Sequence, residues 1–173
     1  MSSEVRKRQI DHLLALVAKG DNEAFSQLYS ATSHGVFSIV YSYMNNYEDT
    51  EDIMQTVYLK IKLNIDSYKI GTNGGAWILS IAKNLALNEL KKKRHTEDID
   101  EQNAGSYEDH SSLEITEIMS KVLSKEEQEI VTLHVLWKYK HKEIAKMLNC
   151  PTGTITSKYK RAIEKLKAQL KDS

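Results

Sequence analysis

Hydrophobic residues recur along most of this chain at spacings of three and four, which is the period of an α-helix rather than of a β-strand. In residues 8–19 the apolar positions Ile10, Leu13 and Val17 share one helical face, and Gly20 follows as a stop signal. The same pattern predicts a helix after Asp21 that continues through residues 36–44, and further helices at 49–65 and 76–94. The fold class expected from this pattern is therefore all-α.

Several polar residues stand where a helix would be expected to begin. Asp21 and Asp49 each precede an amphipathic stretch and are predicted to cap it. Ser124 with Glu127 three residues later has the spacing of a capping box, and it is expected to open a helix through Leu136. The glycine-rich stretch 71–75 is expected to break the chain between two helices.

Residues 95–112 differ in composition from the rest of the chain. They contain Gly105, Ser106, few apolar residues and many charges, which is typical of a flexible linker. Helical periodicity returns at Leu113. The sequence thus predicts two small helical domains, 1–94 and 113–173, joined by an acidic linker at 95–112.

The formal net charge of zero conceals a strong segregation of charge along the chain. Residues 138–171 hold ten basic and two acidic residues, whereas residues 95–117 hold eight acidic residues and no Lys or Arg. A second basic cluster at residues 91–94 stands directly before the acidic run. Such blocks favour DNA-facing ends joined by an acidic connector, although solvated helix faces are an alternative for any single block.

Residues 142–170 have the pattern of a helix-turn-helix. A short amphipathic helix containing Ile144, Ala145 and Leu148 is followed by a turn at 149–151 and a longer helix with basic residues on its first turns. In this motif the second helix can enter the major groove of DNA. DNA is therefore the expected partner.

Other classes of protein find little support. The lone Cys150 excludes an intrachain disulfide, and with six histidines it forms no zinc-like spacing, so neither a metal nor a cofactor is expected. No nucleophile–base arrangement is evident, and the glycines at 71–75 lack the Lys-Ser/Thr of a phosphate loop, which argues against an enzyme. No apolar run is long enough to span a membrane and the polar N-terminus lacks a secretory signal, so a cytoplasmic protein without membrane insertion is expected.

In order and spacing, several short motifs together resemble those of extracytoplasmic-function (ECF) sigma factors, the compact sigma subunits of bacterial RNA polymerase. They cover nearly the whole chain and read GDNEAF at 20–25, LY at 28–29, EDTEDIMQ at 48–55, YL at 58–59, WILSIAKN at 77–84, LSKEE at 123–127 and GTITS at 153–157. The resemblance implies a sigma region 2-like domain at 1–94 and a region 4-like helix-turn-helix domain at 113–173.

The resemblance also implies partners and binding residues. Core RNA polymerase would be bound through its β′ clamp helices and β flap, and the residues expected to meet the clamp helices are Asp49, Glu51, Asp52 and Gln55. Promoter DNA would be the second partner, and an anti-sigma factor is a third partner known in the family. The acidic linker would run through polymerase near the active-site channel.

Two groups of residues are expected to meet the promoter. For recognition of the −10 element and duplex melting, the expected residues are Asn64, Tyr68, Lys83, Asn84, Lys91, Lys92, Lys93 and Arg94. Those predicted for the −35 element are Thr152, Thr154, Thr156, Ser157, Lys158 and Arg161. Tyr68 could stack a flipped base or form a core edge, and the large apolar ring of Trp77 favours a core position.

Two other functions compete with a sigma factor. One is a stand-alone helix-turn-helix transcriptional regulator, in which residues 1–94 serve dimerisation or sensing. The other is a sigma-like decoy that is held by a regulator and has little affinity for DNA.

Overall fold

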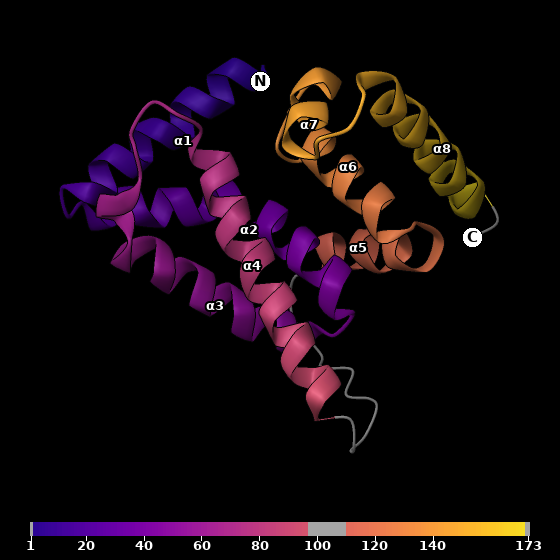
Figure 1. The fold of residues 1–173 in the computed structure, drawn as a ribbon, viewed down its shortest axis with the longest axis horizontal. Helices are drawn as coiled ribbons and strands as arrows, with labels where there is room; N and C mark the ends of the chain where they lie inside the picture. The colour runs from indigo at the N-terminus through magenta and orange to yellow at the C-terminus, as the bar shows by residue number, and fades with distance from the viewer. Residues whose placement is uncertain (1, 97–109, 172–173) are drawn as a thin grey trace.

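The computed structural model describes residues 2–96 and 110–171, and the regular structure within these ranges is entirely helical. In chain order the helices are α1 (Ser3–Ala18), α2 (Asn22–Met44), α3 (Tyr47–Leu63), the 3-10 turn η1 (Ile65–Ser67), α4 (Gly74–His95), α5 (His110–Val122), α6 (Lys125–Val135), α7 (His141–Met147) and α8 (Thr152–Lys171) (Figure 1). The predicted all-α class is confirmed.

Two of the predicted helix starts are confirmed in atomic detail. The Asp21 side chain accepts a hydrogen bond from the Ala24 N–H at 3.0 Å and caps α2. At α6, Ser124 Oγ accepts from the Glu127 N–H while the Glu127 carboxylate accepts from the Ser124 N–H, which is the predicted capping box. Each cap satisfies a backbone donor that has no partner inside its helix.

The prediction that Asp49 caps the third helix is wrong. Asn45 ends α2 in a left-handed conformation (φ 48°), so the chain reverses at once and α3 begins two residues earlier than expected. The cap is Asn46, whose Oδ1 accepts from the Asp49 N–H at 2.9 Å. Asp49 instead lies in the first turn of α3, where a negative charge is favourable beside the positive end of the helix dipole.

The break between α3 and α4 is shorter than the glycine-rich stretch suggested. Asn73 Oδ1 accepts from the Ala76 N–H at 3.1 Å, so α4 begins at Gly74 and includes two of the glycines in its first turn. The remaining loop contains Gly71 with φ 86°, a conformation that residues with a Cβ rarely adopt.

α2 is the central element of the molecule. Every residue from 35 to 42 is buried, because α1, α3 and α4 surround the helix on one side and α5 and α6 contact it on the other. In Figure 1, α1–α4 lie on one side and α5–α8 on the other, with α6 beside α2. We call residues 2–96 the N-terminal unit and residues 110–171 the C-terminal unit.

One hydrophobic core runs through both units. It begins with residues of α1–α4, such as Leu28 and Ile61, and continues without interruption into Leu133 and Ile144 of the C-terminal unit. A second, small core lies within the C-terminal unit and consists of Met119, Leu123, Val131 and Ala162. The two parts of the chain that the sequence predicts to be separate helical domains thus share most of their buried apolar residues in one core.

The predicted helix-turn-helix is present. After α7, Asn149 adopts a left-handed conformation (φ 52°), and the Cys150 N–H donates to the Ala145 carbonyl at 2.9 Å. This turn brings α8 back against α7, where Ile144 and Ile155 are buried.

The neighbouring helices end and begin close to the predicted boundaries of the linker. α4 extends to His95, one residue past the predicted domain end at 94, and α5 begins at His110 rather than at 113. Most of the predicted linker at 95–112, including Gly105 and Ser106, lies outside the described residues.

Candidate nucleic-acid interface

The first half of α3 carries the residues predicted to bind polymerase. Asp52 and Gln55 are exposed, whereas Asp49 and Glu51 are half-buried. The Asp49 carboxylate forms an ion pair with Lys93 near the end of α4. The helix therefore offers an acidic and amide strip to a partner, with one of its carboxylates already partly neutralised from within the chain.

An apolar cleft of 350 Å³ adjoins this strip between α2 and α3. Within it Tyr29 and Leu59 are 45% and 57% exposed, so two large apolar side chains meet water side by side in one hollow. The full lining is Phe25, Tyr29, Glu51, Met54, Gln55, Tyr58, Leu59 and Lys62. Sequence reasoning did not assign the cleft to a partner, although a signal was present: Leu59 lies one turn beyond Gln55 on the outward strip, not on the inward strip of Val57 and Ile61.

A second cavity, of 260 Å³, lies between the end of α3 and the middle of α4. It brings together Asn64 and Asn84, which are twenty residues apart in the chain and which were both predicted to contact the −10 element. Its other lining residues are Lys60, Ser67, Trp77, Ile81, Leu85 and Asn88. Amide groups beside an aromatic ring can hydrogen-bond a base edge and stack a base face.

Tyr68 is buried, so its ring is not open to stack on a base in this conformation. Its side chain is 7% exposed, its hydroxyl donates to Asp11 Oδ1 at 2.6 Å, and its ring centroid lies 5.0 Å from that of Trp77. Burial, together with the hydrogen bond to Asp11, raises the pKa of Tyr68 to about 12. In this conformation the buried Tyr68 packs against Trp77. Trp77, which was expected in the core, is half-buried against the core and is also the aromatic ring that lines the cavity.

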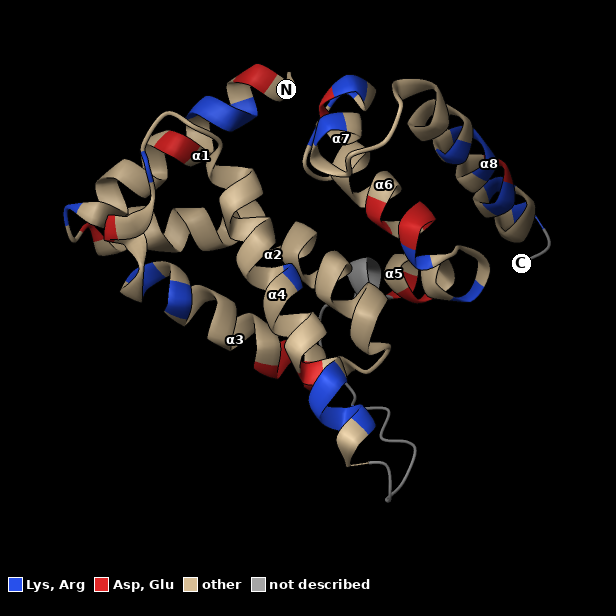
Figure 2. Ribbon diagram, in the orientation of Figure 1, with Lys and Arg blue, Asp and Glu red and all other residues tan. Residues whose placement is uncertain are grey.

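The basic residues predicted for phosphate contact differ in their surroundings. Lys83 pairs with Glu129 of α6 at 2.7 Å; burial by itself lowers the pKa of Lys83, but the bond and charge of Glu129 outweigh it and the net shift is upward. Lys91 and Arg94 are exposed at the far end of α4, where Figure 2 shows a basic patch. Lys92 lies 3.7 Å from Glu89 in an exposed pair.

The predicted −35 residues occupy the first turns of α8. Those that are exposed are Thr152, Thr156, Ser157 and Arg161, whereas Thr154 is half-buried. Thr156 Oγ1 lies 3.0 Å from His141 Nδ1 of α7, which ties the two helices of the motif together. Lys158 forms an ion pair with Glu126 of α6, so Arg161 is the exposed cation among the predicted −35 residues.

Comparison with known proteins identifies both halves of the chain. The family model described as Sigma-70 region 2 matches residues 28–96, and the model described as Sigma-70, region 4 matches residues 107–166. The chain is 30% identical over 171 residues to the ECF RNA polymerase sigma-E factor of Escherichia coli (strain K12), covering 88% of this chain and 89% of that one. The chain belongs to the ECF RNA polymerase sigma factor family. It acts in transcription initiation with RNA polymerase and is not an enzyme.

Other relatives agree with this membership. The ECF RNA polymerase sigma factor SigW of Bacillus subtilis (strain 168) is 29% identical over 176 residues, covering 90% of this chain and 94% of its own. Among solved structures, CnrH in complex with the cytosolic domain of CnrY matches with a TM-score of 0.64 at 18% identity, over 95% of this chain and 99% of CnrH. RpoE of Bartonella quintana in complex with the anti-sigma factor NepR matches with a TM-score of 0.64 at 24% identity, over 85% and 96% of the two chains. These two structures support the fold.

The two matched regions divide the candidate sites of this sigma factor. Region 2 contains the acidic strip of α3, the Asn64–Asn84 cavity and the basic end of α4, and region 4 contains the helix-turn-helix. In the described part of the chain, no three His, Cys, Asp or Glu side chains are grouped so as to hold a metal ion. No helix between residues 2 and 96 or between 110 and 171 is long and apolar enough to cross a membrane.

Proposed function

We propose that this ECF sigma factor binds core RNA polymerase through α3, reads the −10 element with the α3–α4 cavity, reads the −35 element with α8, and promotes opening of the duplex. The observation that carries the proposal is the cavity itself. Folding brings Asn64, Asn84 and Trp77 to one surface hollow beside the basic end of α4.

The polymerase-binding surface consists of the acidic strip and the apolar cleft next to it. The exposed Asp52 and Gln55 suit a basic partner helix such as the β′ clamp helices, and Leu59 supplies apolar area that water would otherwise cover. Charges at the rim of such an interface mainly speed and orient association, while buried apolar contacts slow dissociation. The region 4 domain meets the β flap in the same proposal.

Capture of an unstacked base in the α3–α4 cavity would stabilise melted DNA. Extruding a base costs a few kcal/mol, and stacking on an aromatic ring with hydrogen bonds to the base edge offsets that cost. Asn64 Nδ2 donates to the Lys60 carbonyl at 2.9 Å, which orients its Oδ1 as an acceptor. Lys91 and Arg94 would then hold the phosphates of the nontemplate strand, adding affinity and salt dependence without base information.

Readout of the −35 element rests on the exposed first turns of α8. Arg161 can donate two hydrogen bonds to a guanine edge, and the hydroxyls of Thr152 and Ser157 can bond bases or phosphates. Lys158, which is paired with Glu126 in this conformation, would have to exchange that carboxylate for a phosphate.

The proposed domain limits and partners follow from these surfaces. Residues 1–94 and 113–173 would act as the two promoter-binding domains, with 95–112 as the acidic tether that runs through polymerase. An anti-sigma factor is a further proposed partner, since the NepR and CnrY complexes are formed by proteins of the same fold. The proposed site of action is the cytoplasm, where core polymerase is found.

The experiment that tests this function is run-off transcription on sheared genomic DNA from the source organism, with purified core polymerase and with or without this chain. Discrete transcripts that require the chain are expected, and their start sites reveal the promoters. If the chain neither directs new transcripts nor co-elutes with core polymerase, it is a stand-alone regulator instead. Co-elution without transcripts would indicate either the decoy or a factor that needs an additional activator.

A further inference from the structure

A carboxylate of α1 joins the two ends of the loop that leads into α4. Asp11 Oδ1 accepts a hydrogen bond from the Tyr68 hydroxyl at 2.6 Å and a second one from the Gly74 N–H at 2.8 Å. Tyr68 directly follows the 3-10 turn η1, and Gly74 is the first residue of α4. One oxygen atom therefore fixes the chain immediately before and immediately after residues 69–73, which we call the α4 loop.

Both donors suit a carboxylate. Burial, together with the bond to Asp11, raises the pKa of Tyr68 to about 12, so at neutral pH the hydroxyl keeps the proton that it donates. The Gly74 N–H is one of the donors at a helix start that have no acceptor inside the helix, and it lies at the positive end of the helix dipole. A charged acceptor makes stronger hydrogen bonds to such groups than a neutral one does.

α1 approaches the start of α4 so closely that no side chain fits between them. A Cβ atom added at Gly74 would lie 2.5 Å from Leu14 Cδ1 and 2.7 Å from Asp11 Oδ1, both well inside contact distance. Gly74 and Leu14 are buried, and Asp11 is half-buried. The bond between the α4 backbone and the carboxylate thus depends on glycine at position 74.

The two bonded residues stand next to the walls of the α3–α4 cavity. Ser67, which precedes Tyr68, lines the cavity, and the Tyr68 ring packs against the ring of Trp77, which lines it too. Gly74 lies one turn before Trp77, whose N–H donates to the Asn73 carbonyl at 3.0 Å. The carboxylate of α1 thus lies behind the lining of the cavity and acts on it from two sides.

The C-terminal unit also contacts the start of α4. The Tyr139 hydroxyl donates to Asn73 Oδ1 at 2.8 Å, and the ring of Trp137 lies against Gly75 of α4 and Gly35 of α2. These contacts hold only the α4 side of the loop, whereas the carboxylate of α1 holds both of its ends.

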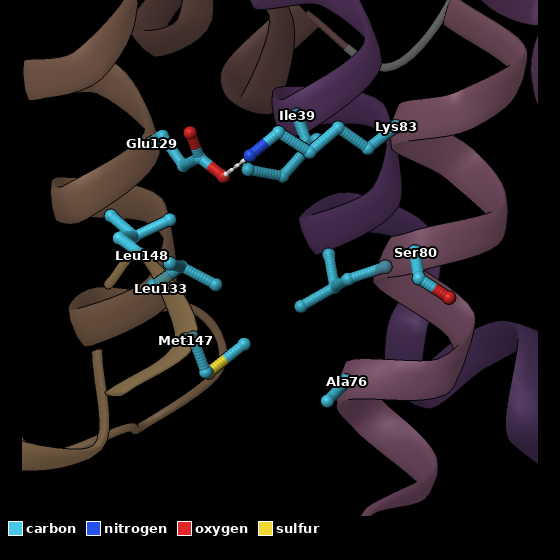
Figure 3. Close-up of a pocket in the computed structure, with 9 residues that line it drawn as sticks. Ile39, Ala76, Ser80, Lys83, Glu129, Leu133, Met147 and Leu148 are labelled. Carbon is cyan, nitrogen blue, oxygen red and sulfur yellow. Dashed lines mark hydrogen bonds and ion pairs between the residues drawn. The ribbon is translucent and has the colours of Figure 1, made fainter. Parts of the chain in front are cut away.

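A neighbouring face of α4 is packed incompletely. There Ala76, Leu133 and Met147 line a largely apolar cavity of 210 Å³ between α4 and the C-terminal unit (Figure 3). An unfilled space of this size forfeits contacts that would otherwise hold the helix. The turn of α4 that carries Trp77 therefore depends on the hydrogen bonds at the start of the helix for its position, and Asp11 makes one of them.

We propose that Asp11 is a positioning residue for recognition of the −10 element. Through its two hydrogen bonds it sets where Trp77 and the α4 loop stand when an unstacked base enters the α3–α4 cavity. A lining that is already in place loses less free energy to ordering when the base binds. The inference rests on the proposed function of that cavity. It assigns a part in reading the promoter to α1, which precedes residues 28–96 matched by the region 2 model.

Base discrimination by the complex with core polymerase tests the inference. The complex is given a nontemplate-strand oligonucleotide with the −10 element found by run-off transcription, and a second oligonucleotide in which that element is mutated. The ratio of the two affinities measures discrimination, and the affinity of the chain for core polymerase is measured in parallel. Asp11→Ala removes the acceptor of both hydrogen bonds and should lower the ratio about tenfold, with the affinity for core polymerase unchanged.

Two conservative variants separate positioning from a general loss of structure. Asp11→Asn retains an oxygen that can accept from both donors and lacks only the charge, so it should restore most of the discrimination that Asp11→Ala loses. Tyr68→Phe keeps the ring and removes one of the two donors, and it should lower the ratio about threefold. An unchanged ratio in Tyr68→Phe overturns the inference, because the ring without its bond to Asp11 would then suffice.

Glu4→Ala is the matched control. It removes another carboxylate of α1, one that is exposed and paired with Arg8, and it should leave the ratio unchanged. The inference is overturned if Asp11→Ala discriminates as well as the wild type, or if it loses affinity equally for both oligonucleotides. A wild-type chain that does not distinguish the two oligonucleotides refutes the proposed function of the cavity, and the inference with it, so the two failures are told apart.

Discussion

In the N-terminal unit α2 is enclosed largely by helices of the same unit, whereas the C-terminal unit directs much of its apolar surface onto α2 and α4 of its neighbour. Its own core is small, consisting of Met119, Leu123, Val131 and Ala162. A unit of about 60 residues can bury only a modest fraction of its surface by itself. The C-terminal unit therefore has the more to gain from docking, and its aromatic residues are the ones that cross the interface.

The two units also neutralise their basic residues differently. At the end of α4, Lys91 and Arg94 are exposed, whereas on α8 Lys158 and Lys165 pair with Glu126 and Glu127 of α6. Figure 2 shows this contrast as blue segments at the end of α4, and as red segments of α6, the helix that packs against α8, whose charged segments are mostly blue. In the proposed contact with the −35 element, α8 would thus meet DNA with the cations that α6 leaves unpaired, Arg161 first among them.

The largest effect is expected on stability, when a buried leucine is shortened in the large core rather than in the small one. Leu28→Ala, at a fully buried position of the large core, should lower the free energy of unfolding by about 4 kcal/mol. Leu123→Ala in the small core should cost about 2 kcal/mol, because the thinner surroundings relax into the space. Chemical denaturation of the full chain measures both, with the exposed Leu170→Ala as a control near zero. A larger cost at Leu123 than at Leu28 would contradict the comparison.

Charge reversal on α3 should separate polymerase binding from DNA binding. Asp52→Lys places a positive charge on the exposed acidic strip and should weaken binding to core polymerase at least about tenfold, which corresponds to about 1.4 kcal/mol. Glu23→Lys makes the same reversal in the first turn of α2, away from the strip, and serves as the control. Fluorescence anisotropy with labelled chain and core polymerase measures both, and equal affinities would refute the docking surface.

Removal of the exposed arginine of α8 should have the reverse effect: it should weaken recognition of DNA and leave the affinity for polymerase unchanged. Arg161→Ala should reduce discrimination for the −35 element by about 1–3 kcal/mol and leave polymerase binding intact. Lys167→Ala, farther along the same helix and also exposed, should lower affinity evenly across sequences. The measurement is competition binding between the promoter found by run-off transcription and a duplex mutated at −35. If Arg161→Ala loses affinity for core polymerase, then Arg161 belongs to the polymerase interface and not to the −35 contact.

The smallest effect is expected on the pH dependence of stability, through the carboxylate of Glu127. Burial by itself raises the pKa of Glu127, but hydrogen bonds from Lys165 and from the backbone and hydroxyl of Ser124 outweigh it, so the net pKa lies below the ordinary value of 4.5. A depressed pKa stabilises the folded state above the unfolded pKa, and this contribution is lost as pH falls through the folded pKa. The C-terminal unit should therefore lose stability as the pH falls below about 4.5, and this contribution is gone below the folded pKa of Glu127.

Thermal unfolding across pH 3–7 with Glu127→Gln as the comparison checks this last prediction. The glutamine variant lacks the titrating group at the capping box, so its stability should fall less steeply on acidification than that of the wild type. Identical slopes for the two chains would show that other carboxylates carry the acid sensitivity.

Much of the local structure could be predicted from residues close together in the chain. The all-α class, the cap at Asp21, the capping box at Ser124 and the helix-turn-helix depend on spacings of three to five residues, and all are observed. The start of α3 was missed because Asn46 and Asp49 are both good capping residues. Only the left-handed turn at Asn45 decides between them.

Only the tertiary structure decided which parts of the chain pack against each of the residues predicted from the sequence. The period of a helix reveals its apolar side but not the element that covers it, so nothing in the sequence indicated that Tyr68 would be buried against Asp11 and Trp77. The same holds for Glu129 opposite Lys83 and for the glycines beneath Trp137. Apart from Tyr68 and Trp77, which are nine positions apart, these contacts join residues 46 to 102 positions apart. Their partners are chosen by packing and shape, which act only once the helices are assembled.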